Sequence, residues 1–197
     1  MDSFFPEIDL PQQFLTKIRK YGKQKTFKPK EIIIHQGEWF NDLYFIEEGF
    51  VKYTLFSIEG GVQTICYLGK GFFLGEYAYT SGGDNSTVTL EAATTLKLLL
   101  FNQNDKTNLY RIADFKRFLL RNMALMTRLV KTQIESLSLY TSEQRIAKTI
   151  EDSKKHFTYF GKKEAGKYYL TKKEIADLSG CSLETVNRYA KIHSQKE

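Results

Sequence analysis

The sequence predicts an α+β protein: an N-terminal jelly-roll, or double-stranded β-helix, followed by a long helix and a small C-terminal helical domain. Three observations support this prediction. Short apolar runs separated by glycines fill the first half, no glycine or proline occurs from Lys106 to Tyr140, and two short capped helices are expected near the C-terminus. We therefore expect three parts, residues 1–105, 106–140 and 141–197. With 197 residues, of which 42% are hydrophobic and 26% charged, the chain is long enough to bury two cores.

The first part has the pattern of an antiparallel roll preceded by one short helix, which we expect at about residues 11–21. Runs such as EIIIHQGE, DLYFIEEGFVKYTLF and VQTICYLG are rich in β-branched and aromatic residues, which favour strands. Glycines separate these runs, and glycine is a residue that turns accommodate readily. Many short strands with such turns, and no long helices between them, are typical of a roll or barrel. We assign this fold to residues 1–105.

The middle part is predicted to be a helix with one apolar seam. Apolar side chains recur in steps of four and three residues, with Gln133 in the one remaining slot, at Leu119, Met123, Met126, Val130 and Leu137. A helix this long needs a partner for its stripe, either its own β-roll or the same helix of a second chain. A seam this narrow suits a contact between two helices better than a broad core face. We therefore predict that residues 106–140 form a dimerisation helix.

The last part, residues 141–197, carries the pattern of a helix-turn-helix. Thr171 and Glu174 form a predicted capping box that opens the first helix. Gly180 permits the positive φ of a tight turn, and Ser182 is placed to cap the second helix. A basic connector, residues 162–170, precedes the motif. The second helix is predicted to present one face outward, made of Leu183, Glu184, Thr185, Asn187, Arg188 and Lys191.

Positive charge is concentrated in the second half of the chain. Residues 1–105 carry 10 Lys and Arg against 13 Asp and Glu, whereas residues 106–197 carry 19 against 10. This imbalance suggests that the second half meets a polyanion. A solvated lysine-rich surface would give the same count, so a motif has to decide between the two. An outward arginine can bond the edge of guanine with two hydrogen bonds and a glutamate can accept one from cytosine, so the helix-turn-helix favours DNA.

The segment GCSLETVNR, residues 180–188, resembles the recognition segment of the Crp/Fnr family of transcription regulators. QRIAKTI and LTKKEIADLSG are similar to the family at the same relative spacing, so the resemblance covers nearly the whole chain. It implies a homodimer that binds a two-fold symmetric operator in double-stranded DNA, with RNA polymerase as a candidate further partner. It also implies that Glu184 and Arg188 read bases. The residues implied to hold the DNA backbone are Thr171, Ser182, Thr185 and Lys191.

Two features depart from the family pattern. Leu183 stands where the best characterised members carry an arginine, so one guanine contact is lost and the target sequence should differ. Family members usually continue past this motif into a β-hairpin wing that touches DNA. Because the chain ends at Glu197, we expect this wing to be truncated.

The stretch FFLGEYAYTSGGDNSTVTLEAATTLKLLLF resembles the phosphate-binding cassette of cyclic-nucleotide-binding domains. Gly75 and Glu76 fit the glycine–glutamate pair whose carboxylate takes the ribose hydroxyl. Ser86 and Thr87 stand where an arginine followed by serine or threonine would take the cyclic phosphate. No arginine occurs from Lys52 to Asp105, and a buried phosphate without its charge partner would cost on the order of several kcal/mol.

The long helix also departs from a cyclic AMP site. The positions that contact adenine in cyclic AMP binders appear here as Val130 and Lys131 instead of a Thr-Ser pair. We therefore expect either a small-molecule effector other than cyclic AMP or no effector, and we assign no further cofactor. The candidate effector-binding residues are Gly75, Glu76, Ser86, Thr87 and Val130.

Four aromatic residues around the cassette leave two alternatives open. Phe72, Phe73, Tyr77 and Tyr79 could line an apolar effector pocket or belong to the core of the roll, and the second is favoured. The two cysteines and three histidines of the chain are scattered, so we predict no metal site, iron–sulfur cluster or haem.

No catalytic signature is present, because the sequence has no P-loop, no HExxH, no Rossmann fingerprint and no nucleophile–base pair; we predict no enzymatic activity. No apolar run approaches the ~18 residues of a spanning helix, and the N-terminus has no signal-peptide pattern. We expect a cytoplasmic protein without membrane contact. The leading prediction is an effector-modulated, homodimeric DNA-binding regulator. The alternative is a cyclic-nucleotide-binding sensor module whose DNA binding is impaired or lost.

Overall fold

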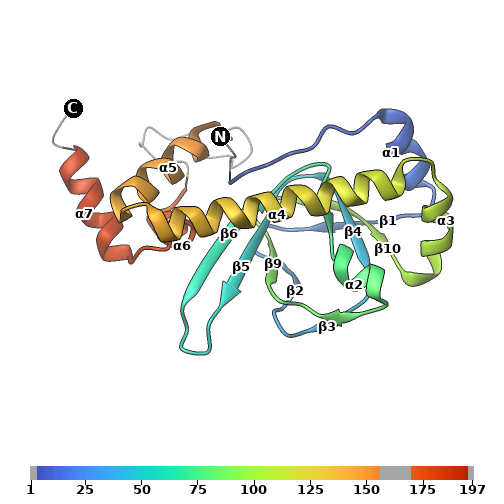
Figure 1. Ribbon diagram of the computed structural model, residues 1–197, viewed down its shortest axis with the longest axis horizontal. Helices are drawn as coiled ribbons and strands as arrows, with labels where there is room; N and C mark the ends of the chain where they lie inside the picture. The colour runs from blue at the N-terminus through green and yellow to red at the C-terminus, as the bar shows by residue number, and fades with distance from the viewer. Residues whose placement is uncertain (1–3, 156–169, 195–197) are drawn as a thin grey trace.

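The computed structural model describes residues 4–155 and 170–194 and confirms the predicted α+β class. A β-roll occupies one part of the molecule, a long helix runs along it, and three helices gather at the far end of that helix (Figure 1). The predicted connector at residues 162–170 falls almost entirely outside the described residues. Among the described residues, no helix is both long and apolar enough to cross a membrane.

The described strands form two four-stranded antiparallel sheets and one short pair. The first sheet, in spatial order, is β1 (Lys23–Phe27), β10 (Leu96–Phe101), β4 (Leu43–Glu48) and β7 (Phe73–Leu74). The second is β2 (Ile32–Ile34), β9 (Thr89–Ala92), β5 (Val51–Phe56) and β6 (Val62–Leu68). The short pair is β3 (Trp39–Phe40) with β8 (Asp84–Asn85). The predicted opening helix is α1 (Gln12–Arg19).

The core of the roll has two parts, one on each face of the first sheet. Strand β10 shows this arrangement, because successive side chains of a strand point to opposite faces. Leu98 belongs to the cluster between the two large sheets, and Leu99 to the cluster under α1 and the helices that come after the roll. Three of the four aromatic residues next to the cassette also belong to these two clusters. Phe72, Phe73 and Tyr79 are buried in these clusters, as favoured from the sequence, whereas Tyr77 is 65% exposed.

The long helical stretch is interrupted near its start. After α2 (Glu76–Ser81) and the short turn η1 (Gln103–Asp105), the chain forms α3 (Lys106–Arg111) and then α4 (Phe115–Leu139). The prediction of one continuous helix from residue 106 is therefore wrong. The chain leaves the helical conformation at Ile112, which is extended, and Asp114 precedes α4 with a φ of 70°, a conformation that aspartate tolerates better than most residues.

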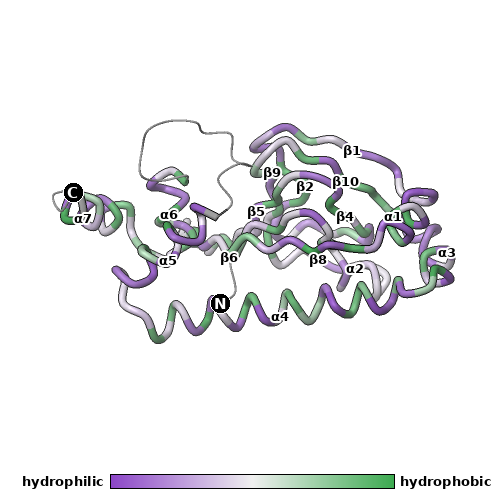
Figure 2. The backbone as a smooth tube through the Cα atoms, turned by 90° about the horizontal axis from the view of Figure 1, so that it is seen from above, coloured by the Kyte–Doolittle hydropathy of each residue, from purple (hydrophilic) through white to green (hydrophobic). Residues whose placement is uncertain are grey.

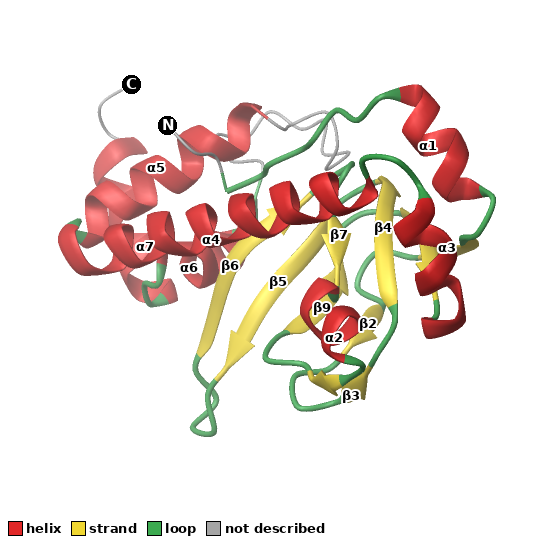
Figure 3. Cartoon of the chain, turned by 45° about the vertical axis from the view of Figure 1, so that its right-hand side comes forward, coloured by secondary structure: helices red, strands yellow, loops and turns green. Residues whose placement is uncertain are grey.

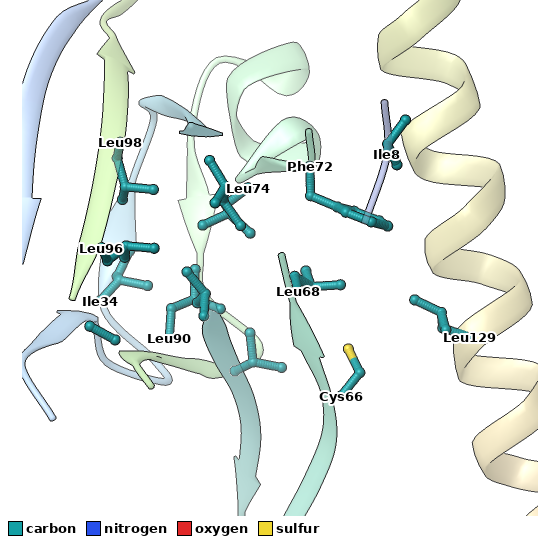
Figure 4. Packing of buried hydrophobic residues seen from close by; sticks show 14 residues of the cluster. Ile8, Ile34, Cys66, Leu68, Phe72, Leu74, Leu90, Leu96, Leu98 and Leu129 are labelled. Atoms are coloured by element: carbon teal, nitrogen blue, oxygen red, sulfur yellow. The ribbon is translucent and has the colours of Figure 1, made fainter. Parts of the chain in front are cut away.

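Helix α4 packs against the roll on one face. Its buried residues are Phe115, Phe118, Leu119, Asn122, Leu129, Gln133 and Ser136. Figure 4 shows Leu129 extending from the helix toward Cys66 and Leu68 of β6. The helix therefore covers its own β-roll, which is one of the two alternatives that the sequence left open, and it keeps a second apolar stripe exposed.

The predicted seam of α4 needs a correction. Leu119 and Gln133 belong to the face that packs within the chain, so they are not available to a second helix. The exposed stripe is rotated relative to the prediction. It consists of Leu120, Val130, Ile134 and Leu137, with the half-buried Met123 between them. These positions also follow steps of three and four residues once Thr127 is included, so sequence periodicity alone could not choose between the two faces.

The C-terminal helices pack on one another and on the roll. They are α5 (Ser142–Lys155), α6 (Lys172–Ser179) and α7 (Leu183–Ser194), and Figure 2 shows them beyond the end of the roll. A third hydrophobic cluster joins this group to β6 and to the N-terminal segment. In this cluster the ring of Phe5 stacks on that of Tyr67 with centroids 5.0 Å apart, and Ile146 and Ile175 belong to the same cluster.

Candidate nucleic-acid interface and effector cavity

The first helix of the C-terminal pair begins at the predicted capping box. The Thr171 hydroxyl accepts a hydrogen bond from the Glu174 N–H at 3.2 Å, and the Glu174 carboxylate accepts one from the Thr171 N–H at 2.6 Å. These two bonds satisfy donors that a helix start would otherwise leave without a partner. The Thr171 hydroxyl also donates to the Glu174 carboxylate at 2.7 Å, so this side chain is held by its own helix.

The turn between the two helices is built as predicted. Gly180 has a φ of 62°, and the Cys181 N–H donates to the Ala176 carbonyl at 3.0 Å. The positive φ favours glycine at this position, and a Cβ on Gly180 would stand 2.5 Å from Leu137 Cδ2, so the Leu137 side chain would have to shift. The Ser182 hydroxyl then accepts from the Thr185 N–H at 3.1 Å and caps α7.

Helix α7 turns one face inward and one outward. Val186 and Ala190 are buried against the rest of the C-terminal domain. The predicted base-reading residues Glu184 and Arg188 are exposed, one helical turn apart, and Lys191 is exposed on the next turn. Leu183 is 47% exposed at the start of the helix. Four of the six sequence-predicted residues of α7 are thus exposed, whereas Thr185 and Asn187 are partly buried; α7 lies at the end of the molecule farthest from α1 (Figure 1).

Sequence reasoning missed the residues that fasten this motif to the rest of the chain. The last carbonyls of α6 and the turn accept hydrogen bonds from side chains of other elements. Gln133 Nε2 donates to the Leu178 carbonyl at 2.9 Å, and Arg145 Nε donates to the Ser179 carbonyl at 2.7 Å. Gln63 of β6 donates to the same Leu178 oxygen at 3.3 Å. No sequence signal marks these residues, because the bonds join positions more than thirty residues apart.

A second candidate site is a cavity of about 80 Å³ in the roll, lined by residues of α2 and of the β3–β8 pair. Figure 3 shows α2 and β3 at the end of the roll away from the C-terminal helices. Four of the five predicted effector residues line it: Gly75, Glu76, Ser86 and Thr87. The structure does not bring Val130 to this cavity, because its side chain lies on the exposed stripe of α4.

Local structure explains why these residues surround the cavity. Gly75 precedes α2 with a φ of 82°, and a Cβ there would stand 2.5 Å from a ring carbon of Phe40. The chain can therefore turn closely over Phe40 and place Glu76 in the wall. The buried Ser86 donates its hydroxyl proton to the Val88 carbonyl at 2.6 Å, so this hydroxyl is already engaged within the loop.

The side chains of the cavity wall that were not predicted include Phe40, Tyr53 and Asp84. Strand pairing brings two of them together, because Phe40 of β3 stands opposite Asp84 of β8. Burial raises the pKa of the Glu76 carboxyl, and a hydrogen bond from its own backbone opposes that rise. Burial first, and then the charge of Glu76, also raise the pKa of Tyr53. Among the described residues, no group of His, Cys, Asp and Glu is arranged to hold a metal ion.

Comparison with known proteins agrees with this arrangement. Residues 24–112 match the family described as cyclic nucleotide-binding domain. The cAMP-activated global transcriptional regulator CRP of Salmonella typhimurium is 26% identical over 167 residues, which is 84% of this chain and 80% of that protein. The structure of the c-di-GMP responsive global regulator CLP of Xanthomonas campestris superposes with a TM-score of 0.77 at 18% identity, covering 94% of this chain and 93% of that one. A CRP-family transcriptional regulator from Thermus thermophilus gives a TM-score of 0.73 at 23% identity, covering 87% and 85%.

Residues 24–112 carry a cyclic nucleotide-binding domain, and the chain as a whole is similar to Crp/Fnr regulators. The domain match covers the roll and its cavity, and the Crp/Fnr relatives are similar over most of the chain, including much of the helical part after the roll. These relatives are named as transcriptional regulators, and their domain suggests a small-molecule effector. The Crp/Fnr resemblance drawn from GCSLETVNR is thereby confirmed.

Proposed function

We propose that this chain is a transcription regulator that binds double-stranded DNA through α7 as a homodimer, under the control of a small molecule other than cyclic AMP. One observation carries the proposal: the capped turn at Gly180 and Ser182 presents Glu184 and Arg188 side by side on an exposed face. Arginine on such a face can donate two hydrogen bonds to guanine, and glutamate can accept from cytosine.

The remaining DNA contacts divide by chemistry. Lys191 is exposed and can neutralise a phosphate. Three hydroxyls take part in the caps of α6 and α7, those of Thr171, Ser182 and Thr185. Their role would be to fix the starts of these two helices, whose N–H groups would face the phosphates of the DNA. Leu183 offers an apolar surface in place of the family's arginine, which suits contact with a thymine methyl group.

The homodimer would use the exposed stripe of α4. Ile134 is 58% exposed and Leu120 is 68% exposed, and both lie on the stripe described above. Two copies of a stripe with this spacing can pack around a two-fold axis, and a two-fold dimer matches a symmetric operator. A regulator of this kind would act in the cytoplasm, where the DNA is, and contact with RNA polymerase would complete its action.

The composition of the cavity wall supports an effector other than cyclic AMP. Neither lysine nor arginine is among the described residues that line the cavity. Ser86, which stands near the position of the phosphate-binding arginine, already donates to a backbone carbonyl. A cyclic phosphate in this wall would lose its water without gaining a charge partner.

The test is selection of bound sequences from random duplex DNA by the full chain, followed by titration of the selected operator and of unrelated DNA. For Arg188→Ala we expect a loss of about 1–3 kcal/mol on the operator and little change on unrelated DNA. Lys20→Ala, an exposed change directly after α1, serves as the matched control. Equal losses on both DNAs would contradict base reading by Arg188. Failure to select any sequence would favour a sensor module without DNA binding.

A further inference from the structure

The chemistry of the roll cavity favours a particular class of effector. Two carboxyl groups, those of Glu76 and Asp84, are in its wall. Three aromatic rings line it as well, those of Phe40, Tyr53 and Tyr77, and no basic residue is among the described lining residues. Carboxylates attract cations, and the faces of aromatic rings attract ammonium groups through their quadrupole.

The described wall carries negative charge that no basic side chain in its lining offsets. The Glu76 carboxyl has a raised pKa because it is removed from water, and its own backbone is the group that opposes this effect. The raised pKa of Tyr53 reflects the nearby Glu76 as its second cause, after burial. A cation placed between these groups would stabilise the charged carboxylate, whereas an anion would meet repulsion from both Glu76 and Asp84.

We propose that the cavity binds the ammonium group of a small organic cation, with Glu76 and Asp84 as its charge partners and the rings of Phe40, Tyr53 and Tyr77 around it. This inference rests on the proposed function insofar as the cavity is taken to be the effector site. The cavity volume of about 80 Å³ suits a compact head group, because sites for drug-sized ligands are roughly 300–1,000 Å³. Tyr77 is 65% exposed, so the part of the wall that it forms is accessible from solvent.

The experiment is calorimetric titration of the full chain with two amines, 1,4-diaminobutane and tyramine. Each amine has a neutral partner of the same shape, 1,4-butanediol and tyrosol, in which hydroxyls replace the amino groups. Cyclic AMP is titrated as the anionic ligand. The proteins are the wild-type chain, Glu76→Gln, and Glu59→Gln, an exposed carboxylate that does not line the cavity.

We expect at least one amine to bind with one molecule per chain. Its neutral partner should bind at least tenfold more weakly, Glu76→Gln should weaken the amine at least tenfold, and Glu59→Gln should leave its affinity unchanged. Binding of neither amine, equal binding to Glu76→Gln, or tighter binding of cyclic AMP would each overturn the proposal. Circular dichroism of Glu76→Gln shows whether the variant is folded, so a loss of binding is not mistaken for unfolding.

Operator binding by the ligand-free chain separates this inference from the proposed function. If the chain selects an operator but binds no amine, the effector class is wrong while the regulator stands. If an amine binds through Glu76 but no DNA sequence is selected, the regulator fails while the ligand class stands.

Discussion

The side-chain amide of Gln133 donates a hydrogen bond to the main-chain carbonyl of Leu178 across 2.9 Å, which joins α4 to the first helix of the helix-turn-helix. Gln63 of β6 donates to the same oxygen at 3.3 Å. The roll, the long helix and the C-terminal domain therefore meet at one carbonyl. Any movement of α4 relative to the roll therefore has to change the hydrogen bonds that hold the C-terminal end of α6.

Gln133→Ala should loosen the attachment of the C-terminal domain. The change removes the shorter of the two bonds to Leu178 and leaves a space at a side chain that is 2% exposed. We expect a loss of about 1–3 kcal/mol in the free energy of unfolding, measured by urea denaturation. Amide hydrogen exchange should become faster in α6. Lys131→Ala, on the exposed side of α4, is the control, and exchange rates in α6 that match this control would contradict the attachment.

Gly180→Ala should lower the free energy of unfolding more than Gly60→Ala does, because Gly60 lies in open space. Both Gly180 and Gly60 have positive φ, 62° and 84°, so alanine at either position carries the backbone cost of about 1–2 kcal/mol. At Gly60 a Cβ meets nothing within 4 Å, whereas at Gly180 it would stand 2.5 Å from Leu137 Cδ2 and 2.8 Å from Gln63 Oε1. The difference between the two variants in thermal denaturation measures the packing of the turn on α4. Equal costs would show that the turn is not pressed against this helix.

Ile134→Lys should weaken the proposed dimer without unfolding the chain. Ile134 is 58% exposed on the apolar stripe, so lysine is tolerated in one chain but would bring two like charges together across a two-fold axis. We expect at least a tenfold weaker dimer by sedimentation equilibrium. Arg121→Glu, which also changes charge on the exposed surface of α4 but lies off the stripe, should leave the dimer intact. A stronger effect from Arg121→Glu would move the interface to another face.

Glu76→Gln should stabilise the ligand-free protein at neutral pH. Burial raises the pKa of this carboxyl above its ordinary value of 4.5, so the folded state binds the proton more tightly than the unfolded state. The stability from this group is present when it is protonated and is lost as pH rises through the folded pKa. Gln mimics the protonated form, and we expect its Tm to be higher by a few degrees at pH 7.

The pH dependence of the Tm tests whether the buried Glu76 carboxylate destabilises the folded protein. The Tm difference between Glu76→Gln and wild type should shrink as pH falls from neutral toward 4.5, because the wild-type carboxyl then becomes protonated. Glu59→Gln, which changes an exposed carboxylate, should show little difference at either pH. A Tm of Glu76→Gln below that of wild type at pH 7 would mean that the charged carboxylate is stabilised by partners in the fold.

The sequence by itself determined the features whose partners lie a few residues apart. The capping box of Thr171 and Glu174, the cap at Ser182 and the positive φ of Gly180 follow from short-range hydrogen bonding and backbone sterics. The lack of an arginine in the cassette also needed no coordinates. Conversely, the break at Asp114 was missed because aspartate is allowed both inside a helix and in the left-handed conformation, and local pattern does not choose between them.

Only the tertiary structure decided which faces and residues meet across long separations. It turned Gln133 toward β6 and left Ile134 outside, paired Phe40 with Asp84 around the cavity, and inserted Phe5 beside Tyr67. The physical reason is that α4 has apolar residues on two adjacent stripes, and interactions within the helix allow either stripe to face the roll. The choice depends on the shape and polarity of the surface against which it packs, and that surface is assembled from strands distant in the chain.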